Sequence, residues 1–123
     1  MLSIDEAIDV VETAILSDVS GFNVIPIAKS FLIKDLFEIY VEHFNLKYIT
    51  TLPRISEKIH EIMISCEEVP RITKMNSDNY FFMHYKNVYN EVKLLNNEYS
   101  SRDNVISKNE LYNYLEKYEF FKP

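Results

Sequence analysis

The sequence predicts a mainly α-helical fold that carries one β-hairpin. Apolar residues recur at helical spacing over most of the 123 residues. A β-branched and aromatic stretch, residues 69–86, is interrupted by four small polar residues at 76–79, which is the pattern of two strands joined by a turn. With 47% hydrophobic residues and this length, we expect a single domain over residues 1–123, whose core needs no disulfide or metal.

The N-terminal segment predicts an acidic amphipathic helix over residues 3–17. Ser3 and Glu6 have the spacing of a capping box, in which each side chain satisfies the other residue's backbone N–H group. Apolar residues then recur on one helix face. Five acids and no Lys or Arg stand among the first 20 residues, and the helix dipole favours acids near an N-terminus.

A short extended piece and a long helix are expected next. The piece covers residues 24–27, and Pro26 restricts it to a sheet edge because proline donates no ladder hydrogen bond. The helix is predicted over 28–44, where a broad apolar face favours a central position in the core. Asn45 is its predicted stop.

A third helix and the hairpin follow. The helix is predicted over 53–65, because Pro53 suits a first helical turn and isoleucines recur at the spacing of an inward face. The hairpin strands are expected at 69–75 and 80–86, with 76–79 as their turn.

The C-terminal part predicts two helices over about 87–118. Helical spacing returns over 87–99, and a polar loop is expected at 100–106. Ser107 and Glu110 form a second capping box, which opens the last helix.

The residue inventory predicts a protein that is not an enzyme and that holds no cofactor or metal. Loops that cradle phosphate need several glycines, and this chain has one, Gly21. A zinc site needs four closely spaced Cys or His ligands, whereas the chain has one Cys and three scattered His. Cys66 and His60 could form a nucleophile and its base, but a small buried cysteine is the interpretation we favour.

The charge and the composition of the chain indicate the kind of genome that encodes it and the cellular compartment in which it works. The net charge of −6 argues against a general nucleic-acid coat. Eleven asparagines, and ten lysines against three arginines, suit an AT-rich genome such as that of a phage or another virus. A single cysteine, no apolar run long enough to cross a membrane and no positively charged leader predict a cytoplasmic protein without membrane contact, inside the host cell if the protein is viral.

The order of the central elements predicts a winged helix-turn-helix with added N-terminal and C-terminal helices. In that fold the helix over 53–65 enters the major groove of DNA, and the hairpin lies along the neighbouring backbone or minor groove. Cations and small polar donors are the side chains that such contacts need. The candidates are Thr51, Arg54, Ser56 and Lys58 at the helix, and Arg71, Lys74, Asn76, Asn79 and Lys86 on the hairpin.

Residues 30–86 resemble the winged-helix region at the C-terminus of phage and large DNA-virus primase-helicases. That region has an L-Y-x-x-Y-like helix, a helix that opens with Ser, and a basic-aromatic hairpin. The matching residues are Leu36, Phe37 and Tyr40 for the first element, Ser56 to Ile62 for the second, and Arg71 to Phe82 for the third. Since this chain has no ATPase, the resemblance implies at most the DNA-binding appendage.

Two functions stay open. One is a small viral or phage winged-helix protein that binds double-stranded DNA as a transcription regulator or replication accessory, with its acidic helix facing away from DNA or forming a homodimer. The other is a protein-binding inhibitor or adaptor that acts on a host polymerase, nuclease or defence complex, or on a viral protein. Its partner surface would combine acids and aromatics: Asp5, Asp9, Glu12, Tyr112, Tyr114, Tyr118, Phe120 and Phe121.

Overall fold

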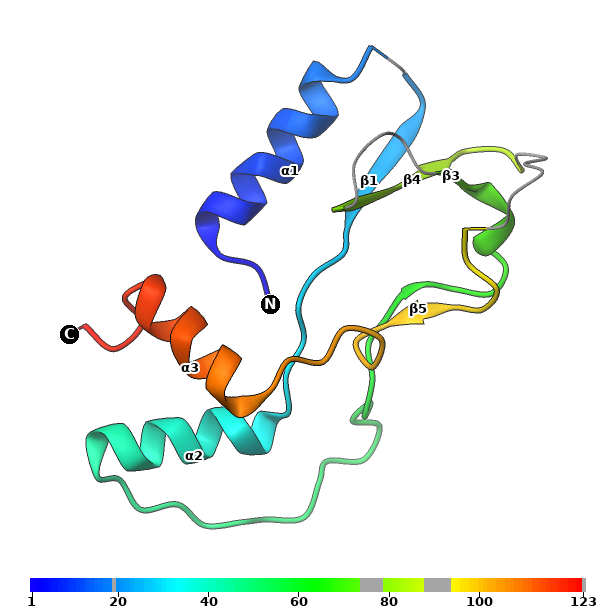
Figure 1. Cartoon of the computed structure of the whole chain (residues 1–123). Coiled ribbons are helices and arrows are strands. Elements are labelled where there is room, and N and C mark those ends of the chain that lie inside the picture. Colours follow the sequence, from blue (N-terminus) through cyan, green and yellow to red (C-terminus); the bar gives the residue numbers. More distant parts are fainter. Residues whose placement is uncertain (19, 74–78, 88–93, 123) are drawn as a thin grey trace.

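A computed structural model describes residues 1–18, 20–73, 79–87 and 94–122 and shows a mixed fold of helices and sheets (Figure 1). Within these residues the helices are α1 (Ile4–Leu16), α2 (Ile33–Phe44) and α3 (Lys108–Lys117). The strands are β1 (Phe22–Pro26), β2 (Ile62–Ile64), β3 (Ile72–Thr73), β4 (Tyr80–His84) and β5 (Tyr99–Ser100), and a 3-10 turn, η1, spans Val69–Arg71. The predicted mainly α fold with one hairpin, a winged helix-turn-helix, is therefore wrong.

The first sheet is antiparallel and has the order β1-β4-β3. The predicted hairpin is confirmed in its pairing, because Ile72 of β3 lies opposite Met83 of β4. Its first strand is shorter than predicted, since residues 69–71 form η1. Residues 76–78 of the predicted turn lie outside the described part of the chain. β1 occupies one edge, with Pro26 opposite Tyr80 at its end, as expected for a strand that contains proline.

The second sheet overturns the predicted helix over 53–65. Residues 62–64 form β2 and pair with β5, so that Ile64 lies opposite Tyr99. Ile64 is completely buried, and this burial against a distant segment outweighs the helical spacing of the isoleucines before it. The same pairing corrects the helix predicted over 87–99: residues 94–98 contain no helix, and residues 88–93 are not among those described.

Helix α2 begins later than predicted because the segment before it is held in an extended conformation. Ser30 forms a parallel bridge with Val105. Its N–H donates to the Asn104 carbonyl at 2.9 Å, and its carbonyl accepts from the Ile106 N–H at 2.9 Å. A helix starting at residue 28 would break both bonds. Asn45 ends α2 as predicted, in the left-handed conformation.

Both capping boxes form as predicted. The Ser3 N–H donates to the Glu6 carboxylate at 2.8 Å, and the Ser3 hydroxyl accepts from the Glu6 N–H at 3.1 Å. Ser107 and Glu110 repeat this pair of bonds at the start of α3, at 2.9 and 3.3 Å. These local sequences therefore fix the first residues of α1 and α3.

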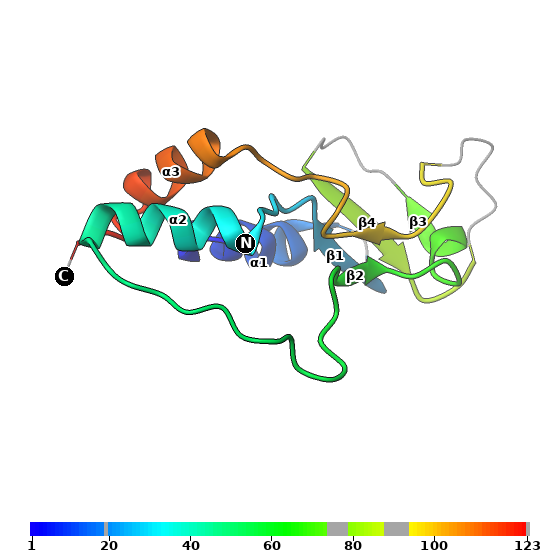
Figure 2. The same cartoon turned by 90° about the horizontal axis from the view of Figure 1, so that it is seen from below.

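Among the described residues the core consists of two clusters, one at each end of the molecule. In Figure 2, α2 and α3 lie side by side at one end, and the two sheets lie at the other. The cluster between the helices contains Ile39, Ile106, Leu111 and Leu115. The cluster between the sheets contains Ile64, Ile72, Phe81 and Tyr99.

Candidate functional site

A long connection between α2 and β2 is the least covered part of the described chain. Residues 45–61, here called the strap, are all described and contain no helix or strand. Its ends are held by hydrogen bonds. At the first end the Leu46 N–H donates to the Val41 carbonyl. At the other end the Glu61 carbonyl accepts from the Ser101 N–H at 2.8 Å, and the Glu61 N–H donates to the Ser101 hydroxyl at 3.0 Å. Between these points the strap bows away from α2 and from the sheets (Figure 2). A connection of this length without regular structure is uncommon in a small domain and often has a function.

The strap carries large apolar side chains that face solvent. The exposed fractions are 89% for Ile49, 91% for Leu52, 98% for Ile55 and 91% for Ile59, and Leu46 and Tyr48 are also exposed. Single exposed apolar residues are ordinary on a protein surface. Six of them stand within this one connection, at positions 46–59, which is more than single exposed residues would give.

The neighbouring face of α2 continues this apolar surface. Ile33 and Phe37 of α2 are exposed, and together with Tyr48 and Ile49 of the strap they line a cavity of about 500 Å³. Thr50 and Thr51 add hydroxyl groups to its strap side. We call the strap together with Ile33 and Phe37 the strap surface.

Charged groups at the edge of the strap surface are paired with one another. The Lys108 amine donates to Glu38 at 3.0 Å and to Glu42 at 2.9 Å, and Lys34 lies 3.5 Å from Glu38. The hydrogen bond from Lys108 lowers the pKa of Glu38, and the hydrogen bond to Glu42 raises the pKa of Lys108. The contacts between Lys108 and the two glutamates also fasten α3 to α2.

The candidate DNA-binding residues of the predicted third helix lie on the strap. Thr51, Arg54, Ser56 and Lys58 are all exposed there. Residues 54–57 form a tight local turn, in which the Arg54 N–H donates to the Glu57 carboxylate and the Glu57 N–H donates to the Arg54 carbonyl, both at 3.2 Å. These side chains therefore do not share the outer face of a helix.

The candidates from the predicted hairpin belong to the first sheet and its surroundings. The Arg71 guanidinium donates to Glu68 at 2.9 Å, so its charge is balanced locally. The Lys86 amine lies 5.1 Å from the centre of the Tyr85 ring. The Asn79 carbonyl accepts from the Ile27 N–H at 2.9 Å. Lys74 and Asn76 lie outside the described residues.

The candidate partner residues divide into exposed and packed groups. The three acids Asp5, Asp9 and Glu12 are exposed on α1, and Tyr112 and Phe120 are exposed near the C-terminus. Tyr114 is buried and its hydroxyl donates to Glu6. Tyr118 lies against Tyr114 with ring centres 4.7 Å apart, and Phe121 stacks on His43 at 4.4 Å. The structure thus brings Tyr114, Tyr118 and Phe121 into internal contacts.

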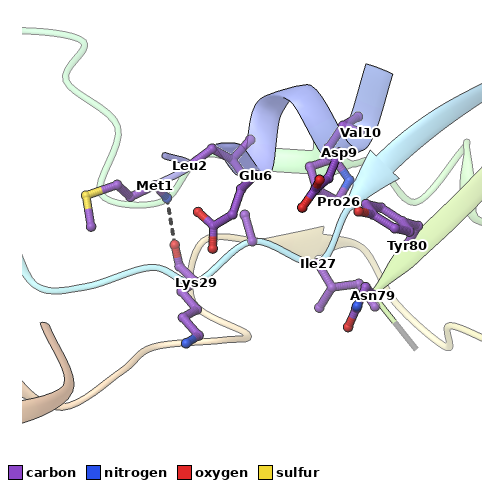
Figure 3. A pocket seen from close by; sticks show the side chains of 11 residues that line it. Met1, Leu2, Glu6, Asp9, Val10, Pro26, Ile27, Lys29, Asn79 and Tyr80 are labelled. Atoms are coloured by element: carbon purple, nitrogen blue, oxygen red, sulfur yellow. Dashed lines mark hydrogen bonds between the residues drawn. The ribbon is translucent and has the colours of Figure 1, made fainter. Parts of the chain in front are cut away.

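A smaller cavity of about 230 Å³ lies between the N-terminal segment, β1 and Tyr80 (Figure 3). The Met1 amine donates to the Lys29 carbonyl at 2.6 Å, and burial lowers the pKa of this amine. Burial also acts to raise the pKa of Glu6, but hydrogen bonds from Ser3 and Tyr114 outweigh it, and the pKa is lowered. Glu6 is therefore held by structural hydrogen bonds.

The described residues also place the cysteine and the side chains that could bind a metal ion. The Cys66 thiol is exposed and forms no disulfide, which differs from the buried cysteine that we favoured. Among the described ranges, no group of three His, Cys, Asp or Glu side chains is arranged to hold a metal ion. No helix in the part that the structure describes has the length and apolar character to cross a membrane.

No protein-family model matches this chain, and no curated protein matches it significantly.

The strap surface was missed in the sequence because its isoleucines recur at helical spacing. Leu52, Ile55, Ile59 and Ile62 are separated by three, four and three residues, which predicts one buried helix face. Of these side chains, Leu52, Ile55 and Ile59 are almost fully exposed. A cue was present, since three β-branched residues, Ile49, Thr50 and Thr51, stand just before Leu52 and Pro53 and favour an extended backbone.

Proposed function

We propose that this protein is a protein-binding module whose strap surface contacts the partner. The observation that carries the proposal is the row of nearly fully exposed apolar side chains at Ile49, Leu52, Ile55 and Ile59. Burying apolar surface contributes about 25 cal/mol per Å², so a partner that covers these side chains gains binding free energy from each of them.

The geometry of the strap surface favours a protein over a small molecule as the partner. Its apolar side chains extend along the strap and onto Ile33 and Phe37 of α2, whereas a small-molecule site encloses most of its ligand in one concave pocket. Aromatic and branched apolar residues at the centre of an interface are the usual sources of binding free energy. Phe37 and Ile49, which both line the 500 Å³ cavity, are our candidates for that centre.

We expect this binding to occur in the cytoplasm, or inside the host cell for a viral protein. The basis is the single cysteine, Cys66, whose exposed thiol suits a reducing compartment. Inhibition or adaptation of a host polymerase, nuclease or defence complex stays a prediction about which protein is bound.

The test is capture of a partner by matched variants of the full chain. Tagged wild-type protein, Ile55→Ser/Ile59→Ser and the control Lys58→Ser are immobilised and exposed to lysate, and retained proteins are identified by mass spectrometry. We expect one partner to be retained by wild type and Lys58→Ser and lost from the double serine variant. Equal retention by all three proteins, or no specific retention by any, would contradict the proposal.

Binding of double-stranded DNA is the other function that the sequence predicts, and it stays a prediction. The same preparation tests it by fluorescence anisotropy with a labelled duplex at several salt concentrations. A DNA-binding protein loses affinity steeply with salt, with a slope of about −0.9 per phosphate contacted. We expect no binding at low salt, and a steep slope that Arg54→Ser/Lys58→Ser reduces would favour DNA instead.

A further inference from the structure

Helix α1 exposes the apolar stripe that an amphipathic helix ordinarily buries. All of its residues are described, and none of them is buried. Ile4, Ile8, Val11 and Ile15 are each exposed. Their spacing of four, three and four residues is that of the seam of a two-stranded coiled coil. We call these four side chains the α1 stripe.

The chain itself packs against the opposite side of α1. Glu6, Val10 and Thr13 are the half-buried positions, and α1 lies beside β1 (Figure 1). At about 100° per residue, these three positions lie on the opposite side of the helix from the α1 stripe. The hydrogen bond from Tyr114 to Glu6 holds α1 in this orientation. The fold therefore presents the α1 stripe to solvent.

The two flanks of the α1 stripe differ in size and charge. On a helical wheel, Ala7 and Ala14 border one side, and Asp5 and Glu12 border the other. Small residues let a second helix approach closely. Carboxylates in flanking positions pair with Lys or Arg of a facing helix and select such a partner.

The acidic flank decides which occupant fits. The first 20 residues hold five acids and no Lys or Arg. A second copy in antiparallel orientation would bring Asp5 against Glu12 of the same charge, which is unfavourable. A parallel copy would place the uncharged Ala7 and Ala14 opposite these acids. Anionic lipid surfaces would also be repelled, since helices that lie on membranes carry Lys and Arg on their polar face. A basic partner helix pairs with these acids.

We infer that the α1 stripe is a docking site for an amphipathic helix of another protein, with apolar seam residues flanked by Lys or Arg. The stripe covers residues 4–15, about 17 Å at 1.5 Å per residue, which accommodates about three turns of the partner helix. This site is separate from the strap surface and does not depend on it.

The experiment uses the full chain and two fluorescein-labelled helical peptides. Both have Leu at the seam positions, and the flanking positions are Lys in one peptide and Glu in the other. Fluorescence anisotropy measures their affinities. We expect the Lys peptide to bind at least about tenfold more tightly than the Glu peptide, with the difference shrinking as salt screens the charges.

Three variants connect the binding to the α1 stripe. Ile8→Ser should weaken binding of the Lys peptide about tenfold, which is the effect expected when one apolar interface residue is lost. Asp5→Lys/Glu12→Lys should reverse the preference and favour the Glu peptide. Ile55→Ser/Ile59→Ser, on the strap surface, should bind the Lys peptide as wild type does, so failure of the strap proposal would leave this result unchanged. Urea unfolding establishes that each variant is folded.

Four outcomes would overturn the inference. They are absence of Lys-peptide binding, equal affinity for both peptides, retention of wild-type affinity by Ile8→Ser, and a peptide-free dimer in sedimentation equilibrium that Ile8→Ser dissociates. The last outcome would assign the α1 stripe to a second copy of this chain.

Discussion

Helices α1 and α3 begin in the same way and pack in opposite ways. Each opens with a serine and a glutamate that satisfy each other's backbone groups, Ser3 with Glu6 and Ser107 with Glu110. α3 buries three residues, and two of them, Leu111 at 0% exposure and Leu115, belong to the cluster between α2 and α3. α1 buries none, and Ile4 is 80% exposed. In these two helices the local sequence determines where the helix starts, and the rest of the chain determines whether its apolar stripe is covered. An uncovered stripe is available to a partner.

The largest expected difference between the two helices is in the cost of removing an apolar side chain. Leu111→Ala leaves a cavity in the helical core and should lower the free energy of unfolding by about 2–5 kcal/mol. Ile15→Ala, on the α1 stripe, should change it by less than about 0.5 kcal/mol. Urea unfolding of both variants measures this, and losses of similar size would mean that the chain covers α1.

The contact between Tyr114 and Glu6 links α3 to α1. It should make the free energy of unfolding fall as the pH becomes alkaline. Burial and the hydrogen bond to Glu6 raise the pKa of Tyr114 from 10 to about 12. The folded state therefore favours the protonated phenol: its contribution is complete below pH 10 and is lost as pH rises toward 12. The loss should be on the order of 2 kcal/mol.

Tyr114→Phe tests this pH dependence. The variant should be less stable than wild type at neutral pH by about 1.5–3 kcal/mol, because a hydrogen bond to a carboxylate is lost. Its free energy of unfolding should then fall less than that of wild type between pH 10 and 12. The burial that raises the pKa of Tyr99 would still contribute in both proteins. Parallel curves for the two proteins would show that Tyr114 titrates normally.

Removing the capping serine should loosen the first turn of α1 and of α3 alike, but it should change the global free energy of unfolding by different amounts. Ser107→Ala should lower the free energy of unfolding by about 1 kcal/mol, since α3 unfolds with the core. Ser3→Ala removes the same bonds from a helix with few buried contacts, so it should speed amide hydrogen exchange within α1 more than it changes global stability. Equal global losses would indicate that α1 unfolds only together with the core.

A small effect on stability is also expected on the strap. Ile55→Ser/Ile59→Ser removes two side chains that contact solvent, so the free energy of unfolding should change by less than about 0.5 kcal/mol for each site. Urea unfolding measures the change, with Lys58→Ser as the control in the same segment. A loss above about 2 kcal/mol would mean that the strap packs against the chain.

Predictions from the sequence are correct for features whose interacting residues are close together in the chain. The capping boxes at Ser3 and Ser107, the stop at Asn45 and the pairing of β3 with β4 involve residues that are close to one another in the sequence. The helix predicted over 53–65 is wrong, because residues 62–64 pair with β5, which lies far along the chain. Helical spacing within 53–65 does not reveal that pairing. The predicted placement of Arg54 and Lys58 is wrong for the same reason, because both are expected on a helix that does not form.

Spacing also predicts an apolar face without saying what covers it. Ile8 on α1 and Leu111 on α3 both lie on such faces, yet Ile8 is exposed and Leu111 is buried. The difference comes from the orientation of α1, which lies beside β1 and whose Glu6 accepts a hydrogen bond from Tyr114 of α3. Because Tyr114 lies 108 residues from Glu6 in the sequence, the exposed stripe could be found only in the folded structure.

The exposure of isoleucine methyl groups tests the central claim most directly, because it needs no substitution. A soluble paramagnetic gadolinium chelate is added to the full chain with labelled isoleucine methyls, and their relaxation is measured by NMR. We predict strong relaxation for Ile4, Ile15, Ile55 and Ile59, and weak relaxation for Ile39, Ile64 and Ile72. Protection of the first group to the level of the second, at concentrations where the chain is monomeric, would contradict the claim that α1 and the strap present apolar surfaces for other proteins.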